Sequence, residues 1–165
     1  MSKQMAVIGL MVFLAVTAVA PVVGGMATAS SVDSDWFRGL AKPRWNPPGW
    51  VFGPVWTTLY TLMGLAAWRV WRQAATGAAP AAAVRRALVA FGVQLVLNAA
   101  WTPVFFGAEL LGAALTVIVV MLAAIGWTIR RFGALDRAAA WMLTPYLAWV
   151  AFATLLNAAL WRLNP

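Results

Sequence analysis

The stretch WFRGLAKPRWNPPGWVFGPVWTTLY, residues 36–60, decides how the rest of this chain is interpreted. It brings Trp36, Trp45, Trp50 and Trp56 together with four prolines, directly before a long apolar segment. A tryptophan side chain is large, flat and amphipathic, with an apolar face and a single N–H donor. The stretch therefore predicts either an aromatic belt at a membrane interface or a pocket for a flat apolar ligand.

Composition places the chain in a membrane. Of the 165 residues, 64% are hydrophobic and only 10% are charged, whereas a soluble domain has about 25% charged residues. The apolar residues form runs at about 5–27, 51–71, 87–107, 110–129 and 139–161. Each run has about the 20 residues that a helix needs to cross the hydrocarbon, and helices satisfy their own backbone hydrogen bonds there. The pattern predicts an all-α integral membrane protein, a bundle of five transmembrane helices.

The first run has a second interpretation. Lys3, the apolar run and the small residues Ala27-Thr28-Ala29 resemble a secretory signal with its cleavage site. However, the run is long for a signal core and contains two glycines, Gly24 and Gly25. We therefore expect a retained helix.

Basic residues predict the orientation. Eight of the twelve fall on one side of the five runs, namely Lys3, Arg69, Arg72, Arg85, Arg86, Arg130, Arg131 and Arg137. The other side has four, namely Arg38, Lys42, Arg44 and Arg162. The positive-inside rule then places the N-terminus in the cytoplasm and the tryptophan-rich loop outside. The net charge of +8 thus indicates topology and contact with lipid headgroups, not nucleic acid.

Residue types that are absent exclude several kinds of chemistry. The chain has no cysteine and no histidine, so we expect no metal site, no thiolate nucleophile and no strong axial ligand for haem iron. Glu109 and Asp136 fall in turns, and no carboxylate falls near the centre of a run. This disfavours a proton-coupled exporter, which needs an ionisable group inside the membrane.

Aromatic and amide side chains recur at helical spacing in three of the runs. Each stripe falls on one helix face, and two stripes contain an amide that can hydrogen-bond between helices. Such faces either pack helix on helix or line a pocket with a few polar groups. The stripes are Phe52, Trp56 and Tyr60; Asn98, Trp101 and Phe105; and Trp149, Ala153 and Asn157, with Leu156 alongside.

Five sequence blocks, in order along nearly the whole chain, carry a resemblance to a known family. The blocks are WF with LAKP at 36–43, WNPPGW at 45–50, GPVWTTLY with LMG at 53–64, QLVLN to FFG at 94–107, and PYLAW to LN at 145–157. On these motifs the chain resembles the TspO/MBR family, the tryptophan-rich sensory proteins, which are also called translocator proteins or peripheral-type benzodiazepine receptors.

The resemblance implies a single domain over residues 1–165, a five-helix bundle that is usually a homodimer, and a ligand cavity closed by a lid loop, here residues 28–50. It implies no obligatory cofactor. The ligands of the family are porphyrins, such as protoporphyrin, and in many members cholesterol or benzodiazepine-type drugs. The ligand-binding residues implied are Phe52, Trp56, Tyr60, Asn98, Trp101, Phe105, Trp149, Ala153, Leu156 and Asn157, and the lid residues are Trp36, Lys42, Arg44, Trp45, Pro47 and Pro48.

Two positions depart from the family pattern. Where the proposed cholesterol motif has a tyrosine, this chain has Ala158, although Arg162 is in place; we therefore do not expect physiological cholesterol binding. Some members have a tryptophan where this chain has Arg44. With Arg38 and Lys42, that cation offers a partner for the propionates of a porphyrin.

Three functions follow as hypotheses. The first is a receptor or sensor that binds tetrapyrroles and regulates or carries them. The second is light-dependent degradation of bound protoporphyrin, with Trp149 or Trp36 as the redox partner. The third is a transporter of hydrophobic molecules such as sterols, which the lack of a clear internal repeat disfavours. Because no acid–base pair occurs in the runs, no catalytic residue is predicted for hydrolytic or proton-transfer chemistry.

Overall fold

In the computed structural model the described backbone covers residues 1–31 and 34–165, and side chains are described outside residues 20–33. This part of the chain contains helices and turns and no strand. In chain order the elements are α1 (Lys3–Ser31), α2 (Asp35–Gly39), η1 (Gly49–Val51), α3 (Phe52–Ala75), α4 (Ala81–Thr102), η2 (Pro103–Gly107), α5 (Leu111–Gly133), α6 (Arg137–Met142) and α7 (Thr144–Leu163).

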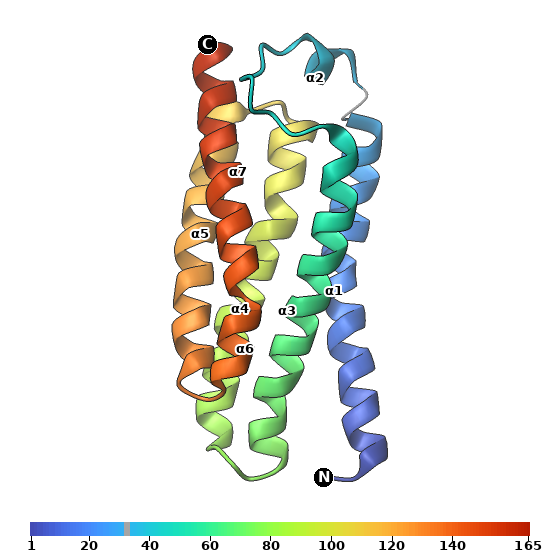
Figure 1. Ribbon diagram of the computed structural model, residues 1–165, viewed down its shortest axis with the longest axis vertical. Helices are drawn as coiled ribbons and strands as arrows, with labels where there is room; N and C mark the ends of the chain where they lie inside the picture. The colour runs from blue at the N-terminus through green and yellow to red at the C-terminus, as the bar shows by residue number, and fades with distance from the viewer. Residues whose placement is uncertain (32–33) are drawn as a thin grey trace.

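The long helices lie side by side in one elongated bundle (Figure 1). Helix α5 packs against α4 and α7, and α1 packs against α3 and α4. The segment with α2 lies across one end of the bundle, next to the C-terminus, while the N-terminus and the α3–α4 turn lie at the other end (Figure 1). We call the first the lid end and the second the basic end.

Three helical segments are long and apolar enough to cross a membrane: Ala81–Gly107, Leu111–Gly133 and Arg137–Leu163. Helix α3 has 24 residues, but its threonines, aromatic residues and arginines lower its mean hydropathy. The part of α1 with described side chains, Lys3–Val19, is apolar but shorter. An all-helical membrane protein is therefore confirmed, whereas the number of five spans stays a prediction.

Several boundaries differ from the predicted ones. The lid loop was expected to begin at residue 28, but α1 continues to Ser31, and the lid contains two short helices of its own. The second span continues to Ala75, beyond the predicted end at 71, and the third begins at Ala81 instead of 87. The side chains of the candidate cleavage segment, residues 27–29, lie outside the described part of the chain.

Prolines explain two irregularities near the lid end and the basic end. Pro103 interrupts the apolar run of α4, and the backbone there widens into the π-helical turn η2, because proline lacks an N–H and its ring crowds the preceding turn. Pro145 similarly lies in the first turn of α7, after a break at Leu143 that separates α6 from α7. The last predicted span is thus two helical segments, α6 and α7, separated by a one-residue break at Leu143 within the apolar stretch Arg137–Leu163.

A glycine brings α1 close to α3. A Cβ atom on Gly64 would lie 2.9 Å from Leu14 Cδ2 and 2.9 Å from Thr17 Oγ1. One turn further along α3, the Trp68 indole donates a hydrogen bond to the Ala6 carbonyl at 3.0 Å. These contacts fix the first helix on the outer side of α3.

Candidate ligand-binding site

A buried chain of hydrogen bonds joins four helices near the middle of the bundle. The Tyr60 hydroxyl of α3 donates to Asn98 Oδ1 of α4 at 2.5 Å. The Asn98 amide donates to the Tyr146 hydroxyl of α7 at 3.1 Å, and Tyr146 donates to Met121 Sδ of α5 at 3.6 Å. All four side chains are buried. Because apolar surroundings make an unpaired polar group costly, this network fixes the register of the four helices.

Aromatic rings cover this polar chain on its lid side. Trp56 stacks on Tyr60 with ring centroids 5.2 Å apart, and it meets the Tyr146 ring edge-on at 6.3 Å. The ring centroid of Trp149 of α7 lies 6.5 Å from that of Trp56 and 5.7 Å from that of Phe52, and both pairs have T-shaped geometry. The spacing of four residues along α3 places its three aromatic rings on the face that meets α7. We call Phe52, Trp56, Tyr60, Tyr146 and Trp149 the aromatic chamber.

A second polar contact lies closer to the lid. The Trp101 indole of α4 donates to Asn157 Oδ1 of α7 at 3.2 Å, and the Asn157 amide donates to the Leu111 carbonyl at 2.9 Å. Trp101 also stacks on Phe105, with ring centroids 4.8 Å apart. Trp101 packs against both hydrophobic clusters of the protein, so it connects the chamber with the layer under the lid.

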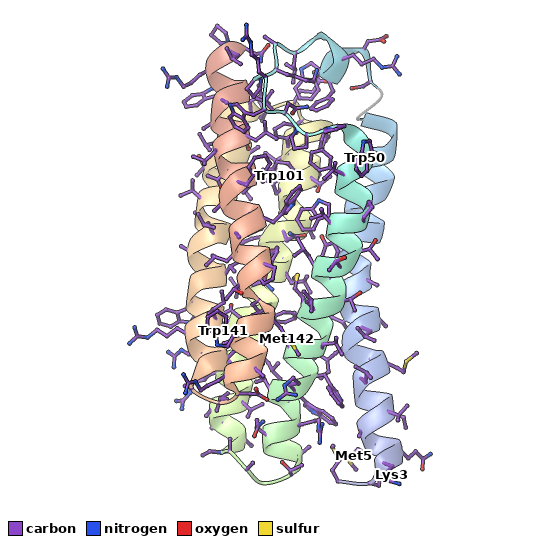
Figure 2. The ribbon with its side chains drawn as sticks, in the orientation of Figure 1. Lys3, Met5, Trp50, Trp101, Trp141 and Met142 are labelled. Atoms are coloured by element: carbon purple, nitrogen blue, oxygen red, sulfur yellow. The ribbon has the colours of Figure 1, made fainter. Side chains whose placement is uncertain are left out.

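The lid packs on the layer directly beneath it. The ring centroids of Trp36 and Phe37 of α2 lie 6.1 and 6.4 Å from that of Phe105. Further along the lid, Trp45 meets Phe152 edge-on at 5.7 Å. Figure 2 shows Trp50 and Trp101 near the lid end and Trp141 towards the basic end.

Two sets of polar contacts, made by Asn164 and by Lys42, stabilise the conformation of the lid. Asn164, just after α7, accepts from the Ala41 N–H at 2.9 Å and donates to the Ala41 carbonyl at 3.0 Å. The Lys42 ammonium lies over the Phe37 ring at 4.7 Å and donates to the carbonyls of Phe37, Arg38 and Leu40. Lys42 therefore caps the C-terminal end of α2, where the helix dipole favours a cation.

The remaining predicted lid residues shape the chain between these anchors. Pro48 precedes η1, and its carbonyl accepts from the Val51 N–H at 3.0 Å. The Pro47 carbonyl accepts from the Asn46 amide at 3.1 Å. Arg44 lies in the same segment with an exposed side chain. Arg44 can therefore bind an incoming anion directly, whereas Lys42 would first have to break its hydrogen bonds to backbone carbonyl groups.

The structure divides the predicted ligand-binding residues into two layers. Phe52, Trp56, Tyr60, Asn98, Trp149 and Ala153 lie in or against the larger cluster around the chamber. Phe105, Leu156 and Asn157 lie nearer the lid, and Trp36 packs there as well. The two candidate redox tryptophans, Trp36 and Trp149, consequently belong to different layers.

Three residues inside the bundle that bear on the candidate site were not among the predicted site residues. Tyr146 completes the buried network, and Phe152 links Trp149 to the lid residue Trp45. Both are in helical register with predicted positions on α7, since Tyr146 lies three residues before Trp149 and Phe152 lies three residues after it, and extending that stripe would have found them. Gln94 is 1% exposed, and its amide nitrogen and oxygen have no hydrogen-bond partner among the described residues; no sequence signal indicates this.

Two pockets lie away from the chamber, at the basic end. One is a mostly apolar groove of about 380 Å³ between α3 and α4. The other, of about 150 Å³, is polar and contains the Arg69–Asp136 ion pair at 2.9 Å. Burial alone would raise the pKa of Asp136, but hydrogen bonds from the Ala139 N–H and from Arg69, with the charge of Arg69, outweigh it and hold that pKa below its ordinary 3.8.

The aromatic chamber is filled by its own rings, which touch in stacked and T-shaped pairs. A flat apolar ligand entering there would have to separate them, and it would find the hydroxyl and amide groups of Tyr60 and Asn98 as its polar contacts. Within the described residues no three Asp, Glu, His or Cys side chains come together to hold a metal ion. The arrangement defines a helical membrane protein with an aromatic, lid-covered candidate site.

Comparisons with known proteins agree with this class. The TspO/MBR family model matches residues 12–162, so the chain belongs to the TspO/MBR family. The human translocator protein is 42% identical over 132 residues, which cover 78% of this chain and 75% of the relative. The tryptophan-rich sensory protein of Cereibacter sphaeroides is 41% identical over 143 residues, 86% of this chain and 85% of the relative. Protein CrtK of Rhodobacter capsulatus is 38% identical over 131 residues, 79% of each chain.

Proposed function

We propose that this protein is a membrane receptor that binds a porphyrin, or a similar flat apolar molecule, in the aromatic chamber beneath the lid. The observation that carries the proposal is the combination of three rings, Phe52, Trp56 and Trp149, around one hydrogen-bonded polar group. Ring faces favour a flat π system, and a few polar groups fix its orientation. The names of two relatives, translocator protein and tryptophan-rich sensory protein, support a transport or sensory role.

The charges of the lid suit the edge of a porphyrin. A porphyrin is an apolar disc with two carboxylates at one side, so the disc belongs in the chamber and the carboxylates belong at the lid. Arg44 is exposed there, and Lys42 is within the same loop, where its ammonium is at present held by carbonyl groups of α2. A charge-assisted bond from either cation would favour the anionic ligand. With no histidine or cysteine in the chain, metal-free protoporphyrin should bind at least as well as haem.

The surrounding architecture forms part of the proposal. We infer five membrane spans, formed by α1, α3, α4, α5 and α6–α7, in a single domain with the N-terminus in the cytoplasm and the lid outside. The basic end, which includes Arg69, Arg85 and Arg130, would then face the cytoplasm. We also expect a homodimer, which the mass of the purified protein in detergent would test.

The test is a titration with protoporphyrin in the dark, followed by tryptophan quenching. Ala153, on the turn of α7 next to Trp149, is half-buried and packs against the chamber cluster. Ala153→Thr should weaken binding by about 1–3 kcal/mol because it overpacks that wall. Ala148→Thr makes the same change on the exposed side of the same helix and should leave the affinity unchanged. Equal affinities for the two variants would contradict the placement of the site.

Light-driven degradation of protoporphyrin is a second candidate, favoured by the contact of Trp149 with Trp56 at 6.5 Å. A pigment between these rings would touch an indole directly. Loss of the porphyrin Soret band on illumination, with a new product in the wild type but not in Trp149→Phe, would support it. A transporter of hydrophobic molecules, the third hypothesis, would instead show flux into sealed liposomes that contain the protein.

A further inference from the structure

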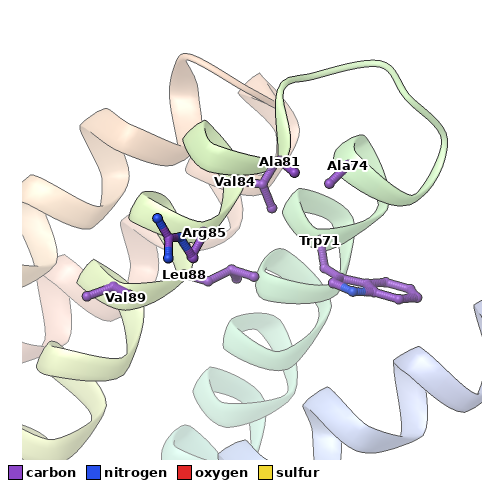
Figure 3. A pocket seen from close by; sticks show the side chains of 7 residues that line it. All are labelled: Trp71, Ala74, Ala81, Val84, Arg85, Leu88 and Val89. Atoms are coloured by element: carbon purple, nitrogen blue, oxygen red, sulfur yellow. The ribbon is translucent and has the colours of Figure 1, made fainter.

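The groove at the basic end has a composition unlike that of the chamber. It lies between the last turns of α3 and the first turns of α4, with a volume of about 380 Å³ (Figure 3). Its walls are formed largely by apolar side chains, and one charged residue lines it. The residues that define it here are Trp71, Ala74, Val84, Arg85, Leu88 and Val89.

One wall of the groove is rigid. The ring of Trp71 packs so closely on α1 that a Cβ atom at Gly9 would lie 2.5 Å from it, and its centroid lies 6.1 Å from that of Phe13. The opposite wall is formed by α4, where Val84 is buried and Val89 is 60% exposed. The groove is therefore held open by packing on the α3 side and faces outward on the α4 side.

The position of the groove along the membrane follows from α4. Val89 belongs to the apolar segment Ala81–Gly107, so its exposed side faces hydrocarbon. Arg85 lies one turn closer to the end of the helix, about 6 Å along the axis, and its side chain is exposed. An arginine at this depth reaches the headgroup layer while apolar residues beside it remain among acyl chains.

The local charge favours an anion. Helix α4 begins without a side-chain cap and without an acidic residue in its first turn, although the N-terminal end of a helix favours negative charge. The described carboxylate at this end, Asp136, is paired with Arg69, whereas Asp35 and Glu109 lie with the lid and with the turn before α5. Arg85 makes no ion pair with the described residues and so has its positive charge uncompensated.

We propose that this groove binds an anionic phospholipid. One acyl chain lies against Trp71, Leu88 and Val89, and the phosphate group is held by the Arg85 guanidinium beside the first N–H groups of α4. The apolar walls require a chain, and the single cation at the rim selects a negative headgroup. This site is at the basic end and shares no lining residue with the chamber, so its test does not depend on porphyrin binding.

Native mass spectrometry of the purified full-length protein, with phosphatidylglycerol or phosphatidylcholine of identical acyl chains added to neutral detergent, tests the proposal. The wild type should retain more phosphatidylglycerol than phosphatidylcholine. Arg85→Gln should lower that preference about fivefold, the effect of one basic residue near an anionic headgroup. Arg86→Gln is the matched control, because Arg86 carries the same charge, is exposed and does not line the groove.

A third variant tests whether the groove itself is occupied. Ala81 is exposed and lines the groove, so Ala81→Trp fills it from the surface and should reduce retention of both phospholipids. Equal losses in Arg85→Gln and Arg86→Gln would overturn the proposal, because bulk charge would then explain the preference. Competition by inorganic phosphate as strong as that by the lipid, or preferential retention of a neutral sterol, would overturn it as well.

Discussion

Two buried amides on the same face of α4 offer a direct test of how polar groups act in this bundle. Asn98 accepts from Tyr60 and donates to Tyr146. Gln94, one turn earlier, is equally buried but has no hydrogen-bond partner among the described residues. Replacing each with leucine removes an amide of similar size at nearly the same depth. Only the substitution of Asn98 should therefore lower the stability of the protein.

The magnitude for Asn98→Leu follows from the bonds that it removes. The Tyr60 hydroxyl loses its acceptor, while Tyr146 loses one donor but still donates to Met121 Sδ. An unsatisfied buried donor costs about 1–3 kcal/mol, and hydrogen bonds between membrane helices contribute up to about 1.7 kcal/mol each. We expect a loss of about 2 kcal/mol in the free energy of unfolding, which corresponds to a fall of about 4–8 °C in the melting temperature.

Gln94→Leu should leave the melting temperature unchanged or raise it, because it removes two buried polar atoms without breaking a hydrogen bond with the described residues. Thermal unfolding of the three proteins in one detergent, followed by tryptophan emission, gives the comparison. Tyr60→Phe should reproduce part of the Asn98→Leu loss, since it removes the donor of the same bond. If Gln94→Leu proves as destabilising as Asn98→Leu, hydrogen bonding is not what distinguishes the two amides.

Three further predictions concern other parts of the bundle. Gly64→Ala should destabilise the protein by about 1–3 kcal/mol, because its Cβ would lie 2.9 Å from side-chain atoms of α1. Gly92→Ala, whose Cβ would have no atom within 4 Å, should leave the stability unchanged, and the melting temperatures of the two variants test this difference. Because the pKa of Asp136 is lowered, its ion pair with Arg69 stabilises the folded protein fully above the ordinary carboxyl pKa, and this stabilisation is lost as the pH falls through the lowered pKa. Asp136→Asn keeps a helix-capping side chain. It should lower the free energy of unfolding by up to about 1 kcal/mol at pH 7 and leave it unchanged in strong acid. Asn164→Ala removes both hydrogen bonds between Asn164 and the lid residue Ala41. It should therefore increase the rates of protoporphyrin binding and release in stopped-flow measurements. Unchanged rates would show that the lid does not limit access to the site.

Periodicity was enough to identify the faces that meet inside the bundle. The spacing of Phe52, Trp56 and Tyr60 along α3 predicted a common face. In the structure the rings of Phe52 and Trp56 contact α7, and Tyr60 stacks on Trp56. Asn98 and Asn157 were expected as interhelical hydrogen-bond donors or acceptors, and both make such bonds. These outcomes depend on helix geometry alone, which the order of residues fixes.

The partners of each side chain could not be predicted in the same way. The division of the candidate site into two layers depends on how α4 and α7 are offset along the bundle axis, and no local pattern reports that offset. Lys42 was expected as a partner for a ligand's carboxylate, and in the structure its ammonium caps α2, a short helix that the sequence analysis did not predict. The break at Leu143, two residues before Pro145, was likewise not predicted within the run 139–161.

The central claim is that the aromatic chamber, rather than the membrane surface or another tryptophan, receives a flat ligand. Titration of wild type, Trp149→Phe and Trp141→Phe with protoporphyrin in the dark tests it most directly, since Trp149 touches Phe52 and Trp56 while Trp141 is 70% exposed near the basic end. The account predicts saturable binding that weakens by about 0.5–1.5 kcal/mol in Trp149→Phe and is unchanged in Trp141→Phe. Binding that is absent, or that responds equally to both substitutions, would contradict it and make the aromatic stripes packing surfaces only.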